Sequence, residues 1–596
     1  MSSPLSLFQT LPLLILEKVV EYLAERPRDS FDTDIDKRNE CKEVLYPLLS
    51  VSEHWREAAL VSLCDNCQIR FDNSPKGLSM TYLTLPSGFP FPLYRGQSLV
   101  KQVIVNAPSW SEIYSRKFRN ISSRSKADFP VFPSATILMV CVITYGVNSR
   151  KPGRRILPAS IAPSTNRNKR AVDFSRALRR LVPAATEIVV SFHSLGSTDE
   201  RNMELCDVLV SELCCGNITR LLVESRSWSS LVSLSLQGLS GLTSITQGPH
   251  MACEPFVRIA HHSAGTLKQL SIELESEADW RALIYGDTKT PAVYSSLTSL
   301  CMETDTIPYA ESWEAIEDVA LFPVLRNLTM WGVYSFDDDS LFRGNGKTLR
   351  NLDIPFSALT KNTFGRFGVF ERSGVTQMNW IAIGTARDKD EALKTGLAND
   401  PIEMQIHRMA EVTTALCLRG DTADDLVYGV ILSAPSTTFI QHIEFCSQPL
   451  YTSHLLKIIS ALPSLASLAC QIDEPEANID AISESKLPNA LLVKHHHLSN
   501  NFKRLVIFDE SDDDADDADD ADEDESDYDY MYRDKDALAK EIAVVAVQIA
   551  VLCPNFRHVD LPKDMRNAYS REVAWAMVNR PFLPYANSLR RLLYTK

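Results

Sequence analysis

The sequence has no long hydrophobic run. Its best candidate, 542–552, is shorter than the roughly 20 residues that a membrane-spanning helix needs, and Gln548 interrupts it. The apolar run 11–16 is too short for a secretory signal and has no basic residue before it. Shares of 45% apolar and 23% charged residues are those of an ordinary folded protein. These features predict a soluble protein of the cytoplasm or the nucleus, without a membrane partner.

Regular cysteine spacing is also missing. The thirteen cysteines do not follow the pattern of disulfide-rich secreted domains, which indicates free thiols in a reducing compartment. Cys64 and Cys67 have the spacing of half a zinc site, but no second pair of ligands completes it. The run 495–497 contains three histidines in a polar stretch, where a solvated loop is the simpler interpretation. We therefore expect no metal and no cofactor.

The common catalytic and nucleotide-binding motifs do not occur. The sequence has no G-x-x-x-x-G-K-[ST], no G-x-S-x-G, no H-E-x-x-H and no G-x-G-x-x-G after a strand. The twelve histidines show no spacing that would pair one with a nucleophile. These absences predict a binding protein and no enzyme. A catalytic site assembled from distant residues stays open as an alternative, because such sites leave no local pattern.

Acidic charge is concentrated in one segment. The formal net charge is −15, and Asp509 to Asp529 contain fifteen acidic residues and no basic one, so the rest of the chain has no net charge. Such a run repels itself and cannot form a core, which predicts a disordered, solvent-exposed insert at 509–530. It is interpreted either as a solubilising loop or as a docking segment for a basic partner.

Basic residues collect between 149 and 180, where several prolines and a glycine interrupt the first part. This composition predicts a basic loop at 149–170 that leads into a helix. A nuclear-import signal or a patch for anionic surfaces is the functional alternative. Because no aromatic residues are interleaved, no nucleic-acid partner is expected.

The body of the chain repeats a six-residue pattern, apolar-x-x-apolar-x-apolar, termed here the hexad, with positions 1 to 6. The best copies are 267–272, 297–302, 325–330 and 349–354, at intervals of 24 to 30 residues. Positions 4 and 6 fall on one face of a strand and position 5 on the other. Weaker copies occur at 100–105, 218–223, from 242, and at 375–380, 440–445, 465–470, 502–507, 556–561 and 589–594.

Helical stretches precede several hexads, most clearly at 537–552, where Pro554 ends the pattern. A helix–strand unit of this kind cannot cover its own apolar face, so parallel stacking of such units would bury a continuous core. The pattern resembles leucine-rich repeats, although the Asn or Cys usual in the following turn is absent from the four best copies. An ordinary α/β domain is the alternative.

Target recognition is expected on the outward strand positions. Trp331 is the leading candidate, because an exposed Trp near Tyr334 and Phe336 would bury a large area at low entropy cost. A shift of register would instead place it in the core. The predicted target-binding residues are Ser271, Glu273, Glu303, Thr329, Trp331, Asp353, Asn379 and Glu444.

The first seventy residues contain two apolar helical stripes. Leu11, Ile15, Leu16, Val19, Val20 and Leu23 share helical spacing, and Pro12 suits an opening turn. A second stripe comprises Leu45, Leu48, Leu49, Ser52 and Trp55. With Leu48-Leu49-Ser50-Val51 and then Trp55-Arg56, this N-terminal part resembles an F-box over about Leu7 to Phe71. It departs from that family at Leu13, where an acidic residue is frequent, and by a polar insert at 24–42.

The resemblance implies a substrate-recognition subunit of an SCF-type, cullin-based ubiquitin ligase. The F-box would dock on a Skp-type adaptor and the repeats would present a target protein. The order of the parts resembles F-box proteins of fungi. A helical cap on a repeat scaffold that has no connection with ubiquitin is the alternative. The residues expected to bind the adaptor are Leu11, Pro12, Ile15, Leu16, Val19, Leu48, Leu49, Val51 and Trp55.

The predicted fold is therefore α/β, with an N-terminal helical F-box followed by a curved leucine-rich-repeat solenoid of helix–strand units. The expected domains are an F-box-like module at 1–71, a Pro/Gly-rich connector at 72–98 and the repeats at 99–596.

Overall fold

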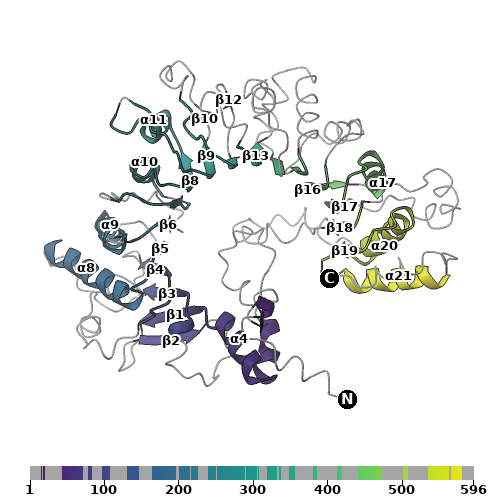
Figure 1. The fold of residues 1–596 in the computed structure, drawn as a ribbon, viewed down its shortest axis with the longest axis horizontal. Coiled ribbons are helices and arrows are strands. Elements are labelled where there is room, and N and C mark those ends of the chain that lie inside the picture. Colours follow the sequence, from purple (N-terminus) through teal and green to yellow (C-terminus); the bar gives the residue numbers. More distant parts are fainter. Residues whose placement is uncertain are drawn as a thin grey trace, which may run out of the picture. The chain divides into compact units, whose positions relative to one another are not determined.

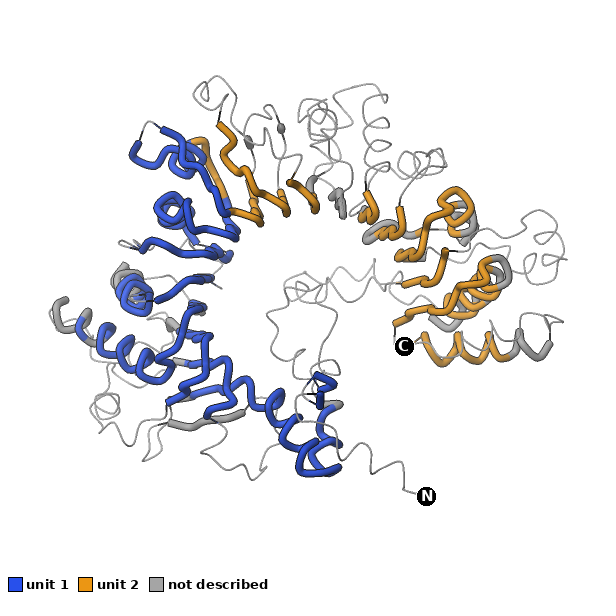
Figure 2. The backbone as a smooth tube through the Cα atoms, viewed as in Figure 1, with its two compact units in different colours: residues 1–273, 278–296 blue, residues 274–277, 297–596 orange. Residues whose placement is uncertain are grey.

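The computed structural model divides the chain into two compact units, described separately below. Unit 1 comprises residues 1–273 and 278–296, and unit 2 comprises 274–277 and 297–596 (Figure 2). The residues described are 15–16, 18–20, 43–71, 78–82, 97–107, 131–145, 164–195, 200–214, 217–225, 236, 239–249, 251–288, 290–304, 306–307, 319–331, 335–336, 348–355, 380–384, 413–418, 440–450, 452–472, 501–507, 535–562 and 565–579.

Unit 1 contains a mainly parallel sheet. Each strand from β4 to β8 runs parallel to its predecessor, β3 pairs in parallel with β1, and β2 is antiparallel to β1. The strands are β1 Asn66–Phe71, β2 Leu78–Tyr82, β3 Gln102–Ala107, β4 Ile137–Tyr145, β5 Glu187–Leu195, β6 Arg220–Ser225, β7 Ser244–Gln247 and β8 Gln269–Leu274.

The helices of unit 1 fall into two groups. The 3-10 helix η1, Glu43–Ser50, and helix α4, Glu53–Leu63, precede the sheet. The others alternate with strands and lie along one side of the sheet (Figure 1). They are α8 Ser164–Leu181, α9 Glu200–Cys214, α10 Cys253–His262 and α11 Glu277–Tyr285.

Unit 2 contains a second parallel sheet. In it β9, β11 and β13 to β19 each pair in parallel with the next, and β10 pairs separately with β12. The strands are β9 Ser299–Thr304, β10 Thr306–Ile307, β11 Asn327–Trp331, β12 Ser335–Phe336, β13 Asn351–Pro355, β14 Trp380–Gly384, β15 Ala415–Leu418, β16 His442–Leu450, β17 Ser467–Ile472, β18 Arg504–Ile507 and β19 His558–Asp560. The helices are α17 Thr452–Ala461, α20 Lys535–Leu552 and α21 Arg566–Asn579. The α/β class predicted from the sequence is confirmed.

The hexad explains why the strands form where they do. Positions 1, 4 and 6 are buried, as at Leu267, Leu270 and Ile272, while position 5, here Ser271, is only partly buried. The predicted burial of positions 1, 4 and 6 is confirmed wherever the structure describes these side chains in the four best copies, but position 5 of the copy 349–354, Asp353, is buried as well. The partly exposed face of each sheet, which carries positions 3 and 5 and the residue after position 6, is termed the open face.

A repeated backbone contact, termed here the carbonyl junction, fixes the register between the strands of neighbouring hexads. The carbonyl of the position 2 residue accepts two N–H groups from the start of the next strand. Thus Thr186 accepts from Thr219 (2.8 Å) and Arg220 (3.1 Å), and Lys503 accepts from Arg557 (2.9 Å) and His558 (3.1 Å). Because register decides which face each side chain occupies, these junctions keep the buried positions of neighbouring strands in line.

The core of each unit is filled by large side chains. Trp280 and Tyr294 are fully buried in unit 1, and the Tyr294 hydroxyl donates to the carbonyl of Leu283 at 2.8 Å. Burial raises the pKa of the Tyr294 hydroxyl above its usual value, so the group stays neutral. In unit 2, the Phe502 and Phe556 rings, both at position 1, stack with centroids 5.5 Å apart.

Several expectations are corrected by the structure. The expected connector 72–98 contains β2, which joins the sheet, and the expected basic loop 149–170 overlaps α8, which begins at Ser164. The expected hexad 375–380 is displaced, because the strand there is β14, Trp380–Gly384. The insert 24–42, the acidic segment 509–530 and the copy 589–594 lie outside the described residues.

Within the described part of the chain, no helix is both long enough and apolar enough to span a membrane.

Candidate protein-binding surfaces

The N-terminal module, defined as the described residues 15–16, 18–20 and 43–63, has its own apolar core. The buried cluster consists of Leu16, Val20, Leu45, Leu49, Trp55, Ala58, Ala59 and Leu63. Ser52 begins α4 by accepting the backbone N–H of Trp55 at its hydroxyl (3.3 Å), a typical N-cap. The Arg56 guanidinium donates to the carbonyl of Leu49 (2.8 Å) and ties α4 to η1.

A second set of apolar residues in this module faces solvent. Ile15 is 46% exposed, Val19 is 36% exposed and Val51 is 51% exposed. Ile15 and Val19 are four residues apart in helical backbone, so they share one face, while Leu16 and Val20 form the neighbouring buried stripe. The module therefore exposes apolar side chains in addition to those that are buried in its core.

These positions divide the residues predicted to bind an adaptor. Ile15, Val19 and Val51 are exposed and available, and Leu48 is partly buried against the cluster. Leu16, Leu49 and Trp55 are buried in the module itself, so the prediction that they contact a partner directly is corrected. Leu11 and Pro12 lie outside the described residues.

The residues predicted to bind a target lie on the open faces, but not all are accessible. Ser271, Glu273, Thr329 and Glu444 are partly exposed and Glu303 is exposed. Asp353, expected outward, is instead buried. Trp331 pairs with Glu303 in the ladder between β9 and β11, although its side chain is not among those described. Asn379 lies outside the described residues.

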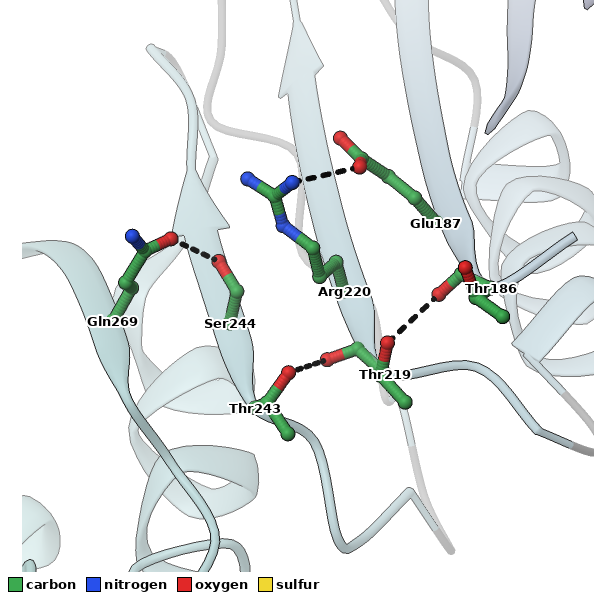
Figure 3. A network of polar contacts seen from close by, with 7 residues as sticks. All are labelled: Thr186, Glu187, Thr219, Arg220, Thr243, Ser244 and Gln269. Atoms are coloured by element: carbon green, nitrogen blue, oxygen red, sulfur yellow. Dashed lines mark hydrogen bonds and ion pairs between the residues drawn. The ribbon is translucent and has the colours of Figure 1, made fainter. Parts of the chain in front are cut away.

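A polar network crosses the strand starts of unit 1 (Figure 3). The hydroxyl of Thr243 donates to the Thr219 carbonyl (3.0 Å), and that of Thr219 donates to the Thr186 carbonyl (3.3 Å). Arg220 forms an ion pair with Glu187 across β5 and β6 at 2.9 Å. The threonines thus add side-chain donors to the carbonyl junctions, which gives this network a structural role.

A different polar group occupies the open face of unit 2 at β16 to β19, and the sequence did not predict it. Nδ1 of His442 lies 2.7 Å from the Ser467 hydroxyl, and Nε of Arg504 donates to Asp560 at 2.5 Å. Partial burial, and secondarily the Arg504 charge, lower the pKa of His442 below its usual value. Aligning the hexads would have revealed the group, since His442, Ser467, Arg504 and His558 all stand at position 3.

The Cys64–Cys67 pair does not have the character of a metal site. Both thiols are buried. Burial is the main cause that raises the pKa of Cys67 to about 12, and the electrostatic effect of the nearby Cys64 thiol is the second cause. Metal ligation requires the thiolate, which such a pKa disfavours. Among the described residues, no three His, Cys, Asp or Glu side chains are grouped so that they could hold a metal ion.

We expect the buried thiols to be inert in the folded protein. Burial raises the pKa of Cys67 and of Cys470 to about 12, so both stay protonated at pH 8. Alkylation by iodoacetamide, mapped by mass spectrometry, should label the partly exposed Cys141 and Cys301 much faster than Cys67 and Cys470. Equal labelling in the native protein would contradict this, and equal labelling in denaturant is the control.

No known protein-family model matches the sequence, and no curated protein shows significant similarity to it.

Proposed function

We propose that this protein is the substrate-recognition subunit of an SCF-type ubiquitin ligase. The N-terminal module docks on a Skp-type adaptor and the open sheet faces bind the target protein. One observation carries the proposal: apolar side chains are exposed in the module at three of the positions that the resemblance to an F-box assigns to the adaptor. Large apolar residues that are clearly exposed in the described chain are Ile15, Val19, Val51, Val131 and Val293, and the first three belong to the module.

The energetics favour a protein partner for this surface. Burying an apolar side chain of this size stabilises a complex by about 1.5–3 kcal/mol when it is fully removed from water. Three such residues on a module whose core is already filled provide a dry contact without unfolding the module. Leu16 and Val20 pack in the buried cluster and thereby hold the helical segment that carries Ile15 and Val19 in place.

The test is binding to a Skp-type adaptor by the full chain and by the triple variant Ile15→Asp, Val19→Asp, Val51→Asp. All three side chains are exposed, so the variant should fold normally, whereas a carboxylate buried in the interface should weaken binding at least 30-fold. Co-purification and isothermal titration calorimetry give the affinity. Val293→Asp, also at an exposed valine (41%), is the matched control and should bind like the wild type.

Failure of the wild-type chain to bind any Skp-type adaptor would overturn the proposal. An unchanged affinity of the triple variant would show that the module binds through another surface. Circular dichroism of each variant separates loss of binding from loss of fold.

A non-catalytic repeat scaffold is the second candidate, and one observation favours it. Leu16 and Trp55, which the resemblance assigns to the adaptor, are buried in the core of the module. In addition, only Cys64 and Asp65 separate α4 from β1. A module joined so closely to the sheet can serve as its cap. On this hypothesis the triple variant has no effect on any partner, and the adaptor does not co-purify.

A further inference from the structure

The outer side of helix α8 is a basic surface that the proposed function does not use. Lys169, Arg176 and Arg180 are exposed there, and Arg179 beside them is partly exposed. Intervals of seven and eleven residues return to the same side of an α-helix, so the three exposed cations lie in one line. The four residues, termed here the basic stripe, extend along about 16 Å of the helix.

The opposite side of α8 fixes the orientation of the basic stripe. Phe174 and Leu178 are fully buried, and the buried hydroxyl of Ser175 donates to the carbonyls of Ala171 (2.9 Å) and of Leu209 in α9 (3.4 Å). Helix α8 lies on the side of the unit 1 sheet that is opposite to the open face (Figure 1). The stripe therefore points away from the sheet, and a ligand bound to it leaves the open face of unit 1 free.

The charge of the basic stripe is not explained by interactions within the protein. Among the described residues, none of its four cations forms an ion pair. Arg179 and Arg180 lie in the last turn of α8, where basic residues interact favourably with the helix dipole. The other two cations of the stripe lie before that turn, so the dipole does not account for them.

The shape of this surface favours a flat anionic partner. A helix with its side chains is about 10–12 Å wide, as wide as the major groove of DNA, so it enters the groove only when most of its circumference is free. One side of α8 is buried, which excludes this mode of binding. Protein interfaces have an apolar centre, whereas none of the clearly exposed large apolar residues of the described chain lies on α8.

Local charge decides whether the stripe attracts an anionic bilayer. The whole chain has a formal net charge of −15, which by itself disfavours such a surface. At physiological ionic strength, however, exposed charges more than about 8 Å apart are largely screened from each other. Helix α8 contains six basic residues and one acidic residue, so its own formal charge is 6 − 1 = +5. The helix therefore presents a positive surface on an acidic protein.

We propose that the basic stripe of α8 binds the surface of membranes that contain anionic phospholipids. Its arginine side chains donate charge-assisted hydrogen bonds to the headgroup phosphates. Each Lys or Arg near such a surface contributes about a fivefold factor in affinity. This contact needs no membrane-spanning helix, so the hydrophobic runs of the sequence did not predict it. It is also independent of the proposed function, because it requires neither an adaptor nor a target.

The test is co-sedimentation of the full chain with vesicles at physiological ionic strength. One set of vesicles consists of phosphatidylcholine, and the other contains in addition about 30% phosphatidylserine, which gives the surface its negative charge. The wild-type chain should bind the second set at least tenfold more tightly than the first. Raising the ionic strength to about 1 M, where the Debye length is about 3 Å, should release it.

The double variant Arg176→Gln, Arg180→Gln should weaken binding to the anionic vesicles at least tenfold, because it removes two charges of the stripe. The double variant Arg258→Gln, Arg281→Gln is the matched control, since both arginines are exposed and lie on other helices of unit 1, α10 and α11. It should leave binding unchanged. Circular dichroism should be native for both variants, because all four substituted side chains are exposed.

Absence of binding to the anionic vesicles by the folded wild-type chain would overturn the proposal. An equal loss in the two double variants would show that binding is diffuse and that the basic stripe is not the site. A fluorescent DNA duplex, measured by fluorescence anisotropy, is the second probe. If the chain binds the duplex and not the vesicles, the surface is a nucleic-acid interface and the proposal is wrong.

Discussion

Replacing Trp55 with alanine is expected to destabilise the N-terminal module by about 3–5 kcal/mol, as typical for loss of a buried tryptophan. The side chain is only 9% exposed and packs in the cluster with Leu16, Leu45 and Leu49. Hydrogen–deuterium exchange of the α4 amides should increase strongly in Trp55→Ala. Limited proteolysis should cleave the module while the sheets of both units stay protected.

The matched control for this experiment is Val51→Ala. Val51 is 51% exposed, so its truncation should change the stability of the module by no more than about 0.5 kcal/mol. Adaptor binding distinguishes the two roles. If Trp55→Ala keeps α4 protected and yet loses the adaptor, Trp55 is a contact residue, as the sequence alone predicted, and its assignment to the core is wrong.

Gly248→Ala should strongly destabilise unit 1. A Cβ atom at this position would lie 2.3 Å from Cβ and 2.8 Å from Cα of Glu224, and 3.0 Å from the carbonyl oxygen of Val223. The backbone N–H of Gly248 already donates to that carbonyl at 2.7 Å, so the two chain segments cannot separate without losing the bond. We expect a loss of about 3 kcal/mol or more, at the upper end for overpacking.

Gly265→Ala is the control, because a Cβ there meets no atom within 4 Å. The extra methyl group should be neutral or stabilise the chain by up to about 1 kcal/mol through the unfolded state. Thermal unfolding followed by circular dichroism compares the two variants. A Gly248→Ala protein with an unchanged midpoint would contradict the close approach of the chain after β7 to β6.

Much of the fold could be predicted because the hexad is strong where position 1 is leucine. The copies at 267–272, 297–302 and 325–330 give strands with the expected burial. Strands β4 and β5 were missed for a physical reason: Ala135 and Ala185 occupy position 1, so the first apolar residue of the pattern is too small to stand out. The helix α8 begins at Ser164, earlier than predicted, because charge and neighbouring prolines suggested a loop as far as residue 170.

The candidate surfaces were harder to predict, because they depend on partners distant in sequence. Helical spacing marks Ile15 and Leu16 alike as apolar, and only the packing of η1 and α4 decides which of the two is buried. The polar group at β16 to β19 joins residues from His442 to His558, which are far apart in the sequence and are related only by an alignment of the hexads. The residues predicted to bind a target stand at position 5 or two residues beyond it, whereas the exposed basic side chains of Arg504 and His558 stand at position 3.

The carbonyl junctions have a consequence for how freely this chain can change in length. Each junction is made by a few backbone atoms at the strand start, as between Lys503 and Arg557. Its geometry does not depend on the number of residues that connect the two strands. Arg350 follows Arg326 by 24 positions, whereas Arg557 follows Lys503 by 54 positions, and both pairs form the same contact. Loop closure adds only about 0.6 kcal/mol for each doubling of length. Foreign segments, such as a tag or a small folded domain, should therefore be tolerated between strands without displacing the strands that follow.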